Sequence, residues 1–497
     1  MAEKHIVTID LGTEKLGVSV AVIDDDQKLS VVYYDEFASD GIKHSRVSNP
    51  KKLAAKLKEV ISQIQEELHI HITEVMVNVQ RYGIRQFDHE EIMDSSDGRS
   101  VSEADISLLN SMVMECEVAE DEKIISCIAQ SYDLDDDELN VDPCDVVGMN
   151  SRTIKGKYKV YALKKTALNN IETAFRECGV NLVHTVFVPD LIGAGVLSEN
   201  EMQSGVALID LGAGASSVSI FQGGVLRHYG SIPFGGNNIT VDIQNVCGIS
   251  LRLAENIKMA FGGCMPHRLG SLGEKKLRIT NTVDKSNREV SVKYLSEIIT
   301  AREGEILNAL LYDIQQSGYA DKLKSGVIVT GGGASMLNIC HFIKDISGYN
   351  AKVAATSRDR FEADSDLFFN VGASMSCGLL RKYTMTDTMG CDEVKAESLQ
   401  SEDITEIDEA QVEAEVQNKE ENAKVKSENG SLFADEEMTI QPEEKMHSFL
   451  SSIGKRMFNK GGKKEIRTSK EKVEQKAATR TDAKTGFDSM FGEDEDV

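Results

Sequence analysis

The sequence has no tryptophan and only 6 prolines among its 497 residues. It also has no run of 18 or more apolar residues, and its first residues lead directly into a strand-like segment without the pattern of a signal peptide. From these absences we expect no membrane-spanning helix and a protein that is made and kept in the cytoplasm. The nine cysteines include no C-x-x-C pair, so we expect small buried hydrophobic side chains and no disulfide or zinc framework.

Positive charge is also scarce, because 55 Lys and Arg residues face 81 Asp and Glu residues and leave a net charge of −26. A chain of this sign is repelled by a phosphate backbone, so the composition argues against nucleic-acid binding. The length leaves room for a large core and for more than one domain.

What the sequence does contain is a repeated pattern of an apolar strand, an aspartate and a glycine turn. The first copy covers residues 6–20 and the second covers residues 206–220. Each copy predicts a β-hairpin, and together they indicate an internal duplication. Taken alone, either copy is equally consistent with an ordinary tight turn in which Asp and Gly only shape the backbone.

The pair of hairpins predicts a site for a nucleoside triphosphate. Glycine lets backbone N–H groups approach a phosphate without an intervening Cβ, and a nearby Asp can reach a hydrated Mg²⁺. Two such turns facing each other would hold the triphosphate from both sides. The candidate residues are Asp10, Gly12, Thr13, Lys15, Asp210, Gly212 and Gly214, of which Asp10 and Asp210 would hold the metal through water.

A third glycine turn and one helix complete the predicted site. Gly331, Gly332 and Gly333 follow a buried strand and precede a helix, which suits the close approach of a nucleoside. Glu255 and Lys258 lie one turn apart on a predicted helix. They form either a surface ion pair or the rim of an adenosine pocket. A further candidate is Gly236, at the start of the preceding helix.

The order of predicted elements is that of an α/β protein. A hairpin, a helix that Asn49 caps and a buried strand at residues 75–79 are typical of half of an actin-like nucleotide-binding fold. Residues 83–159 break this order and predict a small inserted α+β module. Its acidic loop at 133–138 is either solvated or a calcium ligand, but it lacks the EF-hand spacing. Helices rich in small residues are predicted around Gly193 and at residues 372–378. Their small side chains would allow close packing at the two places where the chain crosses between the lobes of such a fold.

A local excess of positive charge lies in the second half of the chain. Between residues 267 and 293, seven Lys and Arg residues face three acids. This stretch is either a solvated surface or a receptor for the acidic tail of a partner. The candidate partner residues are Lys275, Lys276, Arg278 and Arg288.

The tail has a different composition from the rest of the chain. Residues 392–444 carry eighteen acids and four lysines without a periodic apolar face, which predicts a disordered linker. Residues 445–480 then carry eleven Lys and Arg against three Glu. Apolar residues recur here at helical spacing beside basic ones, which predicts a helix lying in a membrane interface or, alternatively, a calmodulin-type target helix. The candidate membrane residues are Met446, Phe449, Leu450, Ile453, Lys455, Arg456, Met457 and Phe458.

These motifs resemble the FtsA family of bacterial cell-division proteins, within the superfamily of actin, heat-shock chaperones and sugar kinases. The resemblance covers residues 5–382 and the plan of the tail. The inserted module is its most specific sign, since actin and the chaperones carry a different insertion elsewhere. The matching stretches are 10–15 and 210–214 for the two phosphate motifs, together with 140–149, 232–240, 254–258 and 330–334.

The resemblance implies an α/β, actin-like duplicated two-lobe fold with a small inserted α+β subdomain, followed by a disordered acidic linker and an amphipathic helix. Lobe I would comprise residues 5–82 and 160–203, with the inserted subdomain at 83–159. Lobe II would comprise a core at 204–235 and 300–365 and a subdomain at 236–299, with a return helix at 366–383. The linker would cover 384–445, the membrane-targeting helix 446–460, and a basic and then acidic tail 461–497.

By this resemblance the protein would bind ATP and Mg²⁺, polymerise with itself as an actin-like protofilament and tether FtsZ filaments to the cytoplasmic face of the inner membrane at the division site. The basic residues near Lys275 would receive the FtsZ C-terminal tail, anionic lipid would receive the terminal helix, and other divisome proteins would bind the inserted subdomain. A pilus-assembly or shape-determining homologue is the alternative, and a sugar kinase is a more distant one.

Departures from the family's pattern bear on hydrolysis. Residues Ala215-Ser216-Ser217 stand where the family usually has hydroxyls and an acid, and Glu14 replaces a small hydroxyl residue. Lys15 and the backbone cradle remain, so we expect ATP binding with weak or absent ATPase activity. The chain also continues well past the predicted membrane helix, whereas family members usually end there.

Overall fold

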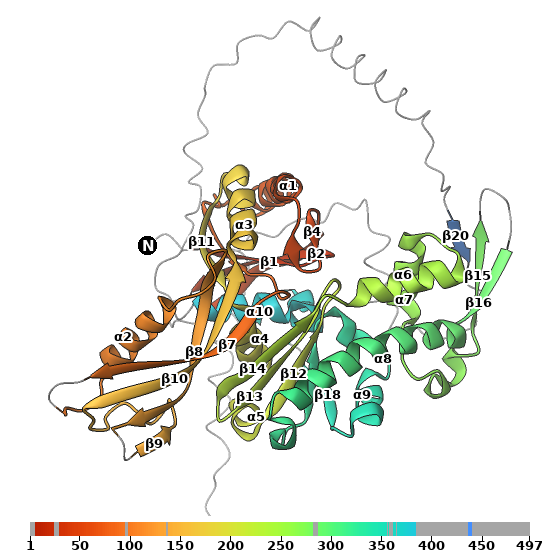
Figure 1. Cartoon of the computed structure of the whole chain (residues 1–497). Coiled ribbons are helices and arrows are strands. Elements are labelled where there is room, and N and C mark those ends of the chain that lie inside the picture. The colour runs from red at the N-terminus through yellow and green to blue at the C-terminus, as the bar shows by residue number, and fades with distance from the viewer. Residues whose placement is uncertain are drawn as a thin grey trace, which may run out of the picture. The chain divides into compact units, whose positions relative to one another are not determined.

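The computed structural model describes residues 5–23, 29–94, 98–135, 138–281, 287–354, 356, 361–363, 365–383 and 436–439. Two sheets carry the predicted hairpins (Figure 1). The first sheet contains β1 (His5–Leu11), β2 (Lys15–Ile23), β3 (Leu29–Ala38), β6 (Glu74–Asn78), β11 (Asn181–Val186) and β19 (Glu362–Ala363). The second contains β12 (Val206–Leu211), β13 (Ser216–Gln222), β14 (Val225–Ile232), β17 (Val327–Thr330) and β18 (Ala351–Val353).

The two sheets share one topology, which confirms the predicted duplication. Their strand orders are β11-β6-β1-β2-β3-β19 and β14-β13-β12-β17-β18. In each sheet the strand that carries the aspartate pairs antiparallel with the next strand of its hairpin and parallel with a later strand, β6 or β17. Every residue of β1 and of β12 is buried. Asp10 and Asp210 therefore lie at corresponding ends of two buried strands.

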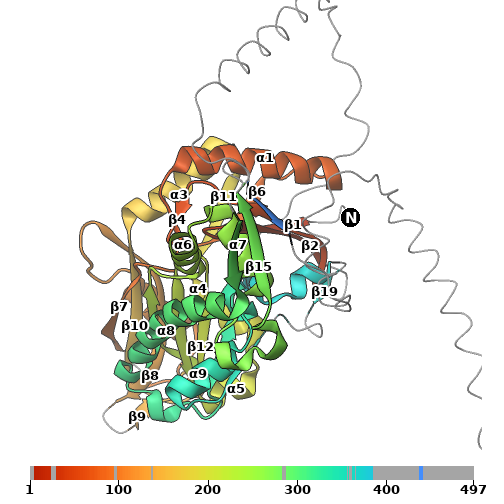
Figure 2. The ribbon, with the colours of Figure 1, turned by 90° about the vertical axis from the view of Figure 1, so that its right-hand side faces the viewer.

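Two helices cover the first sheet (Figure 2). The predicted helix is α1 (Pro50–Leu68), and the Asn49 side chain accepts a hydrogen bond from the Lys52 amide at its N-terminus. Its buried residues repeat at helical spacing and pack in one core with those of α3 (Lys165–Cys178), which lies beside it. A small hairpin of β4 (Ile42–Lys43) and β5 (Arg46–Val47) precedes α1. The amphipathic pattern therefore predicts this part of the fold well.

The predicted small-residue helices pack closely against each other. They are α4 (Val188–Val196) and α10 (Ser374–Tyr383). A Cβ atom at Gly195 would lie 3.2 Å from the carbonyl oxygen of Ser374 and 3.3 Å from the amide nitrogen of Gly378. Glycine is therefore the residue that allows this approach. The short helix α5 (Glu199–Ser204) leads from α4 into the second sheet.

The inserted module has a sheet and a core of its own. Its strands run in the order β7-β10-β8-β9, and α2 packs against β7 and β8. Tyr132 and Tyr158 meet edge-on in its core at a centroid distance of 6.1 Å. In its acidic loop, Asp133 pairs with Lys157 and Asp135 accepts backbone N–H groups, so both carboxylates stabilise the loop. The bounds are β7 (Arg85–Asp94), α2 (Glu103–Met114), β8 (Glu122–Leu134), β9 (Glu138–Val141) and β10 (Thr153–Lys164).

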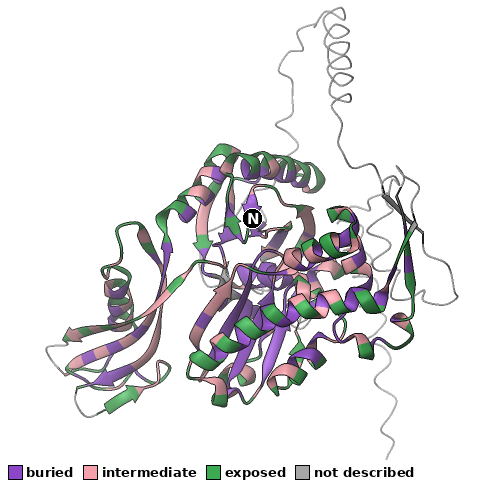
Figure 3. Ribbon diagram, turned by 45° about the vertical axis from the view of Figure 1, so that its right-hand side comes forward, coloured by how far each residue is buried: buried purple, intermediate pink, exposed green. Residues whose placement is uncertain are grey.

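The second sheet is covered by helices whose buried residues form one core with its strands (Figure 3). A small separate sheet of order β16-β15-β20 adjoins this group of helices. The helices are α6 (Gly236–Cys247), α7 (Leu251–Phe261), α8 (Val292–Gln316) and α9 (Ile339–Ser347), and the strands of the small sheet are β15 (Lys276–Asn281), β16 (Asn287–Ser291) and β20 (Glu436–Thr439).

Strand β20 lies within the segment 384–445 for which the sequence predicts a disordered acidic linker. Its four residues pair antiparallel with β15. No apolar periodicity marks these four residues in the sequence, and their strand conformation comes from backbone pairing with the edge of β15. The rest of the predicted linker, all eight predicted membrane residues and the last residues lie outside the described residues.

The membrane and cysteine expectations can be compared with the described residues only. Among them, no helix is long and apolar enough to span a bilayer. Their eight cysteines are free thiols, of which Cys264 and Cys377 are buried. Cys144 is exposed, so the expectation of a buried side chain was wrong at this position. It lies in the loop between β9 and β10, where most neighbouring residues are exposed or half-buried.

Candidate functional site

The first predicted turn joins β1 to β2. The amide of Gly12 donates to the Asp10 carbonyl oxygen at 3.2 Å, and a Cβ at Gly12 would lie 2.4 Å from the Lys15 carbonyl oxygen. Asn78, at the end of the neighbouring parallel strand, donates to Asp10 Oδ1 at 3.0 Å and accepts from the Leu11 amide at 2.7 Å. The turn therefore needs glycine, and the orientation of the aspartate is fixed.

The second predicted turn faces the first. A Cβ at Gly212 would lie 2.5 Å from the Ala215 carbonyl oxygen, which is the same restriction as at Gly12. A Cβ at Gly214 would lie 2.5 Å from Oγ1 of Thr13. The two glycine turns, which are about two hundred residues apart in sequence, are therefore in direct contact.

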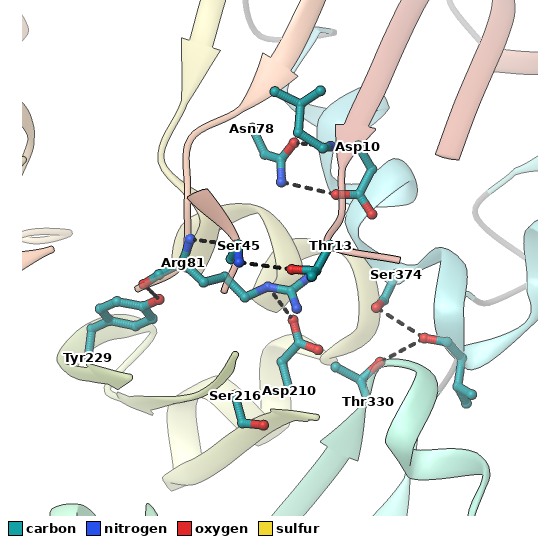
Figure 4. Close-up of polar contacts among 12 residues, drawn as sticks. Asp10, Thr13, Ser45, Asn78, Arg81, Asp210, Ser216, Tyr229, Thr330 and Ser374 are labelled. Atoms are coloured by element: carbon teal, nitrogen blue, oxygen red, sulfur yellow. Dashed lines mark hydrogen bonds and ion pairs between the residues drawn. The ribbon is translucent and has the colours of Figure 1, made fainter. Parts of the chain in front are cut away.

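Arg81 lies between the two turns (Figure 4). Its Nε is 3.1 Å from Asp210 Oδ2, although the two atoms are not aligned as a hydrogen bond. The Nη1 atom of Arg81 lies 2.4 Å from the position that a Cβ atom at Gly212 would occupy. Its own carbonyl oxygen accepts from the Tyr229 hydroxyl at 2.6 Å. The positive charge of Arg81, from lobe I, thus lies next to the carboxylate of Asp210, from lobe II.

Burial dominates the electrostatics of this cluster. It raises the pKa of Asp10 to about 6, against the opposing effect of Arg81 and then Lys15. Burial likewise raises the pKa of Asp210, again against Arg81 and Lys15. Burial would lower the pKa of Arg81, but Asp210 and Asp10 outweigh that effect and raise it. The site therefore holds two carboxylates whose charge is only partly compensated.

Lys15 lies in the site but has a carboxylate partner of its own. Its Nζ is 2.6 Å from Glu36 Oε1 on β3. The same ammonium group lies 2.7 Å from where a Cβ of Gly372 would be. Lys15 is therefore held at the junction of the hairpin and the segment before α10, close enough to both aspartates to lower their pKa values.

The third glycine turn contacts the second. Gly331 has φ of +82°, and a Cβ there would lie 2.2 Å from Asp210 Oδ1. A Cβ at Gly333 would lie 2.7 Å from Cβ of Leu211. Gly332 differs from both, since no atom lies within 4 Å of its Cβ position. The turn therefore packs on β12 on one side and leaves free space on the other.

A polar cluster joins the second turn to α6 and α7. The amide of Gly236 donates to the Gly212 carbonyl oxygen at 3.0 Å. Lys258 Nζ lies 2.7 Å from Glu255 Oε2 and donates to the Gly236 carbonyl oxygen at 3.0 Å. Thr240 donates to Glu255 as well. Since the Lys258 side chain is only 11% exposed, this pair is more than a surface ion pair.

Three residues of the site were absent from the sequence prediction. Arg81 is the first. The sequence feature that could have identified it is its position just after β6, the buried strand that ends beside Asp10. His44 and Ser45 come from the turn between β4 and β5. His44 Nδ1 lies 3.1 Å from the Gly214 carbonyl oxygen, and the Ser45 amide donates to Thr13 Oγ1 at 2.8 Å. No pattern in the sequence marks these two residues.

The residues present are chemically suited to a nucleotide with a hydrated divalent cation. Asp210 Oδ1 is buried without a hydrogen-bond partner, and Asp10 is buried with a raised pKa, so both carboxylates would gain from a cation. Glycine turns leave backbone N–H groups accessible to an anion. Among the described residues no group of three or more His, Cys, Asp and Glu could hold a metal directly.

The predicted partner residues lie apart from this cluster, on and next to the small sheet of β15 and β16. Lys275, Lys276, Arg278 and Arg288 are all exposed. Glu289 is shared by Arg278 at 3.3 Å and Lys276 at 3.5 Å. Arg288 donates to the Gly248 carbonyl oxygen at 2.7 Å, at the end of α6. The group therefore presents more positive charge than its one paired carboxylate balances.

Comparison with known proteins adds a family to this geometry. The profile of a family described as Cell division protein FtsA matches residues 207–369. The chain is 28% identical over 347 residues to the Cell division protein FtsA of Neisseria meningitidis, covering 69% of this chain and 82% of that protein. It is 28% identical over 344 residues to the FtsA of Pseudomonas aeruginosa, covering 69% and 81%. The chain is thus similar in sequence to FtsA proteins over 69% of its length.

Comparison of structures supports the same fold. The solved PilM–PilN type IV pilus biogenesis complex contains a chain that matches this one with a TM-score of 0.55 at 12% identity, covering 76% of this chain and 98% of that chain. At this identity the likeness shows an actin-like α/β fold and nothing about function. The likeness to FtsA proteins, by contrast, is one of sequence and covers 69% of this chain.

Proposed function

We propose that this FtsA relative binds ATP with Mg²⁺ between its lobes, polymerises with itself and tethers FtsZ filaments to the cytoplasmic face of the inner membrane at the division site. The observation that carries the proposal is the meeting of two duplicated glycine turns, each with a buried aspartate. Asp10 comes from one lobe and Asp210 from the other, so one ligand would contact both.

Each part of the cluster has a role in this proposal. The turns around Gly12 and Gly212 would bind the phosphates through backbone N–H groups, and Asp10 and Asp210 would hold the water shell of Mg²⁺. Arg81 and Lys15 would offset the phosphate charge. Gly331–Gly333 would lie against the nucleoside, with Glu255 and Lys258 at its rim.

We further propose that turnover is slow or absent. The hydroxyl of Ser216, one of the residues that departs from the family's pattern, donates to the Phe234 carbonyl oxygen at 2.9 Å. The neighbouring Ser217 is buried, with 2% of its surface exposed. A hydroxyl engaged in this way is not positioned to orient an attacking water, which supports binding without efficient hydrolysis.

The membrane and FtsZ parts of the proposal rest on sequence. The predicted membrane residues from Met446 to Phe458 lie outside the described residues. Their apolar positions at helical spacing, with basic residues beside them, support an interfacial helix. The exposed basic group at Lys275, Lys276, Arg278 and Arg288 would receive the acidic FtsZ tail. Other division proteins would bind the inserted module. The PilM–PilN complex supports the fold alone, so we propose no role in pilus assembly.

Gly332→Val tests the nucleotide site without disturbing the packing at the other glycines. Because no atom lies within 4 Å of the Gly332 Cβ position, the unliganded variant is expected to melt at the temperature of the wild type. Wild-type protein should gain about 2.7 kcal/mol when Mg·ATP is present at a hundred times its Kd, and Gly332→Val should lose this gain. Differential scanning fluorimetry with and without Mg·ATP measures both.

An equal nucleotide-dependent shift in both proteins would contradict the site. Gly331→Val would be a poorer test, because φ of +82° and the nearness of Asp210 make any side chain at position 331 destabilising even without ligand.

A further inference from the structure

Strand β20 is separated from the rest of the described chain by residues 384–435 and still pairs with β15. The pairing is antiparallel, with Thr439 opposite Arg278, Met438 opposite Ile279 and Glu437 opposite Thr280. β15 therefore lies between β16 and β20, and β20 forms the outer edge of this small sheet.

The edge that β20 covers would otherwise be open. Without β20, β15 would pair with β16 along one side only, and its other side would present backbone N–H and C=O groups without partners in the sheet. The side chains of β15 alternate between buried and exposed, as expected of a strand with one buried face. Leu277 and Ile279 are 1% and 2% exposed, whereas Lys276 and Arg278 are on the exposed face. A strand edge of this kind is held in place by β16 on one side and can pair with another strand on the other side.

Charge favours an acidic strand at this edge. Residues 267–293 carry a net charge of +4, from seven Lys and Arg against three acids. Among the residues that the structure describes, Glu289 is the one carboxylate that pairs with Lys276 and Arg278. The segment that contains β20 has the opposite sign, since residues 435–437 are Asp-Glu-Glu within a stretch of eighteen acids and four lysines. Opposite charges increase the rate of encounter and select the partner, while the backbone pairing supplies the register.

We propose that the free edge of β15 is a docking site for an extended acidic segment and that Glu436–Thr439 of the same chain occupy it in cis. Residues 384–435 reach well beyond the size of a domain when extended, at about 3.3 Å per residue. A tether of this length holds the strand at an effective concentration of about a millimolar or less. A strand of four residues has few ladder hydrogen bonds, each worth about 1 kcal/mol net, so an external strand can displace it.

One consequence rests on the proposed function. We propose that the FtsZ tail binds the basic group, and this group belongs to the same subdomain that the cis strand pairs with. Tail binding and cis pairing would then compete, and the linker would weaken FtsZ binding until the strand is released.

The proposal is tested by hydrogen exchange of β15 in the full chain. Successive N–H groups of a strand point in opposite directions, so the double variant Glu437→Pro and Met438→Pro removes one ladder donor whichever residue faces β15. The β15 peptide should exchange about tenfold faster in this variant, which corresponds to about 1.4 kcal/mol of lost pairing. The matched control, Ala414→Pro and Glu415→Pro in the same acidic stretch, should exchange like the wild type.

Equal exchange in all three proteins would overturn the proposal. A β15 protection that falls when the wild-type protein is diluted would also overturn it, because the strand would then come from a second copy. Titration of an FtsZ tail peptide separates this inference from the proposed function. Tighter binding to the strand variant than to the control supports the competition. Absence of binding to every protein, with the exchange difference intact, contradicts the proposed partner and leaves the cis strand supported.

Discussion

Asp10 lies at the end of β1 with 6% of its surface exposed, and burial raises its pKa from an ordinary value of 3.8 to about 6. In the unfolded chain the carboxyl ionises at lower pH than in the folded protein. The stability that this group contributes is therefore fully present below pH 3.8 and is lost as the pH rises through about 6. The loss is about 3 kcal/mol, since one pKa unit corresponds to about 1.4 kcal/mol.

Asp10→Asn should remove this pH dependence. The amide keeps an oxygen that can accept from Asn78 but carries no charge to bury. We expect the unliganded variant to be more stable than the wild type by about 1–3 kcal/mol at pH 7.5, with a smaller difference at pH 5.5. Urea unfolding at the two pH values measures this. Asp88→Asn, at a carboxylate that is 77% exposed, is the control, and an Asp10→Asn protein that is less stable at both pH values would contradict the account.

At the scale of residues, the sequence predicts the parts of the site that have a local pattern. Asp10, Gly12, Asp210 and Gly212 were found because a buried strand followed by Asp and Gly is readable within ten residues. Arg81 was not found, because its pairing with Asp210 depends on how two distant segments meet. The same holds for His44, whose contact with Gly214 spans 170 residues.

At the scale of elements, the inserted module is attached to lobe II by hydrogen bonds between β8 and β14. Arg227 Nη1 donates to the Gln130 carbonyl oxygen at 2.6 Å, and Gln130 Nε2 donates to the Leu226 carbonyl oxygen at 3.0 Å. A nearby bond of the same kind joins the Tyr229 amide to Gln86 Oε1 at 2.9 Å. These bonds fix the direction in which the module projects.

Arg227→Met should loosen this attachment. It removes the charged donor to the Gln130 carbonyl oxygen and the Arg227 Nε bond to the Gln222 carbonyl oxygen, at a cost of about 1–3 kcal/mol in unfolding free energy. Chemical denaturation measures the change. Arg85→Met is a matched control, because Arg85 pairs with Glu122 inside the module and is 45% exposed, so its loss should cost less than about 1 kcal/mol. Equal effects of the two variants would show that the module is not held at this contact.

Helices and strands with a clear hydrophobic periodicity in the sequence were predictable. Elements that form only by pairing with a distant segment were not. α1 follows from its capping residue and apolar stripe, and the two hairpins follow from their strands and glycines. β20 could not be predicted, since Glu436–Thr439 have neither a period nor an apolar face. Their conformation depends on an edge that lies some 160 residues earlier in the chain.

At the scale of the whole molecule, the proposed function links a nucleotide-dependent polymer to a membrane through the terminal helix. Phe449→Glu with Ile453→Glu should abolish flotation with anionic liposomes, because both residues lie on the predicted apolar stripe and each basic neighbour adds only about 1 kcal/mol of surface attraction. Ser448→Glu with Ser452→Glu introduces the same charge on the polar side and should retain most binding. Equal flotation of the two variants would contradict the tether.

The central claim is that residues from both lobes hold one nucleotide. Isothermal titration of Mg·ATP into the wild type, Asp10→Asn and Asp210→Asn tests it directly, since each variant changes one lobe by a single near-isosteric substitution. We expect one site per chain in the wild type and binding that is at least about tenfold weaker in both variants, a loss of about 1.4 kcal/mol or more. Wild-type protein that binds no nucleotide, or either variant binding as tightly as the wild type, would contradict it.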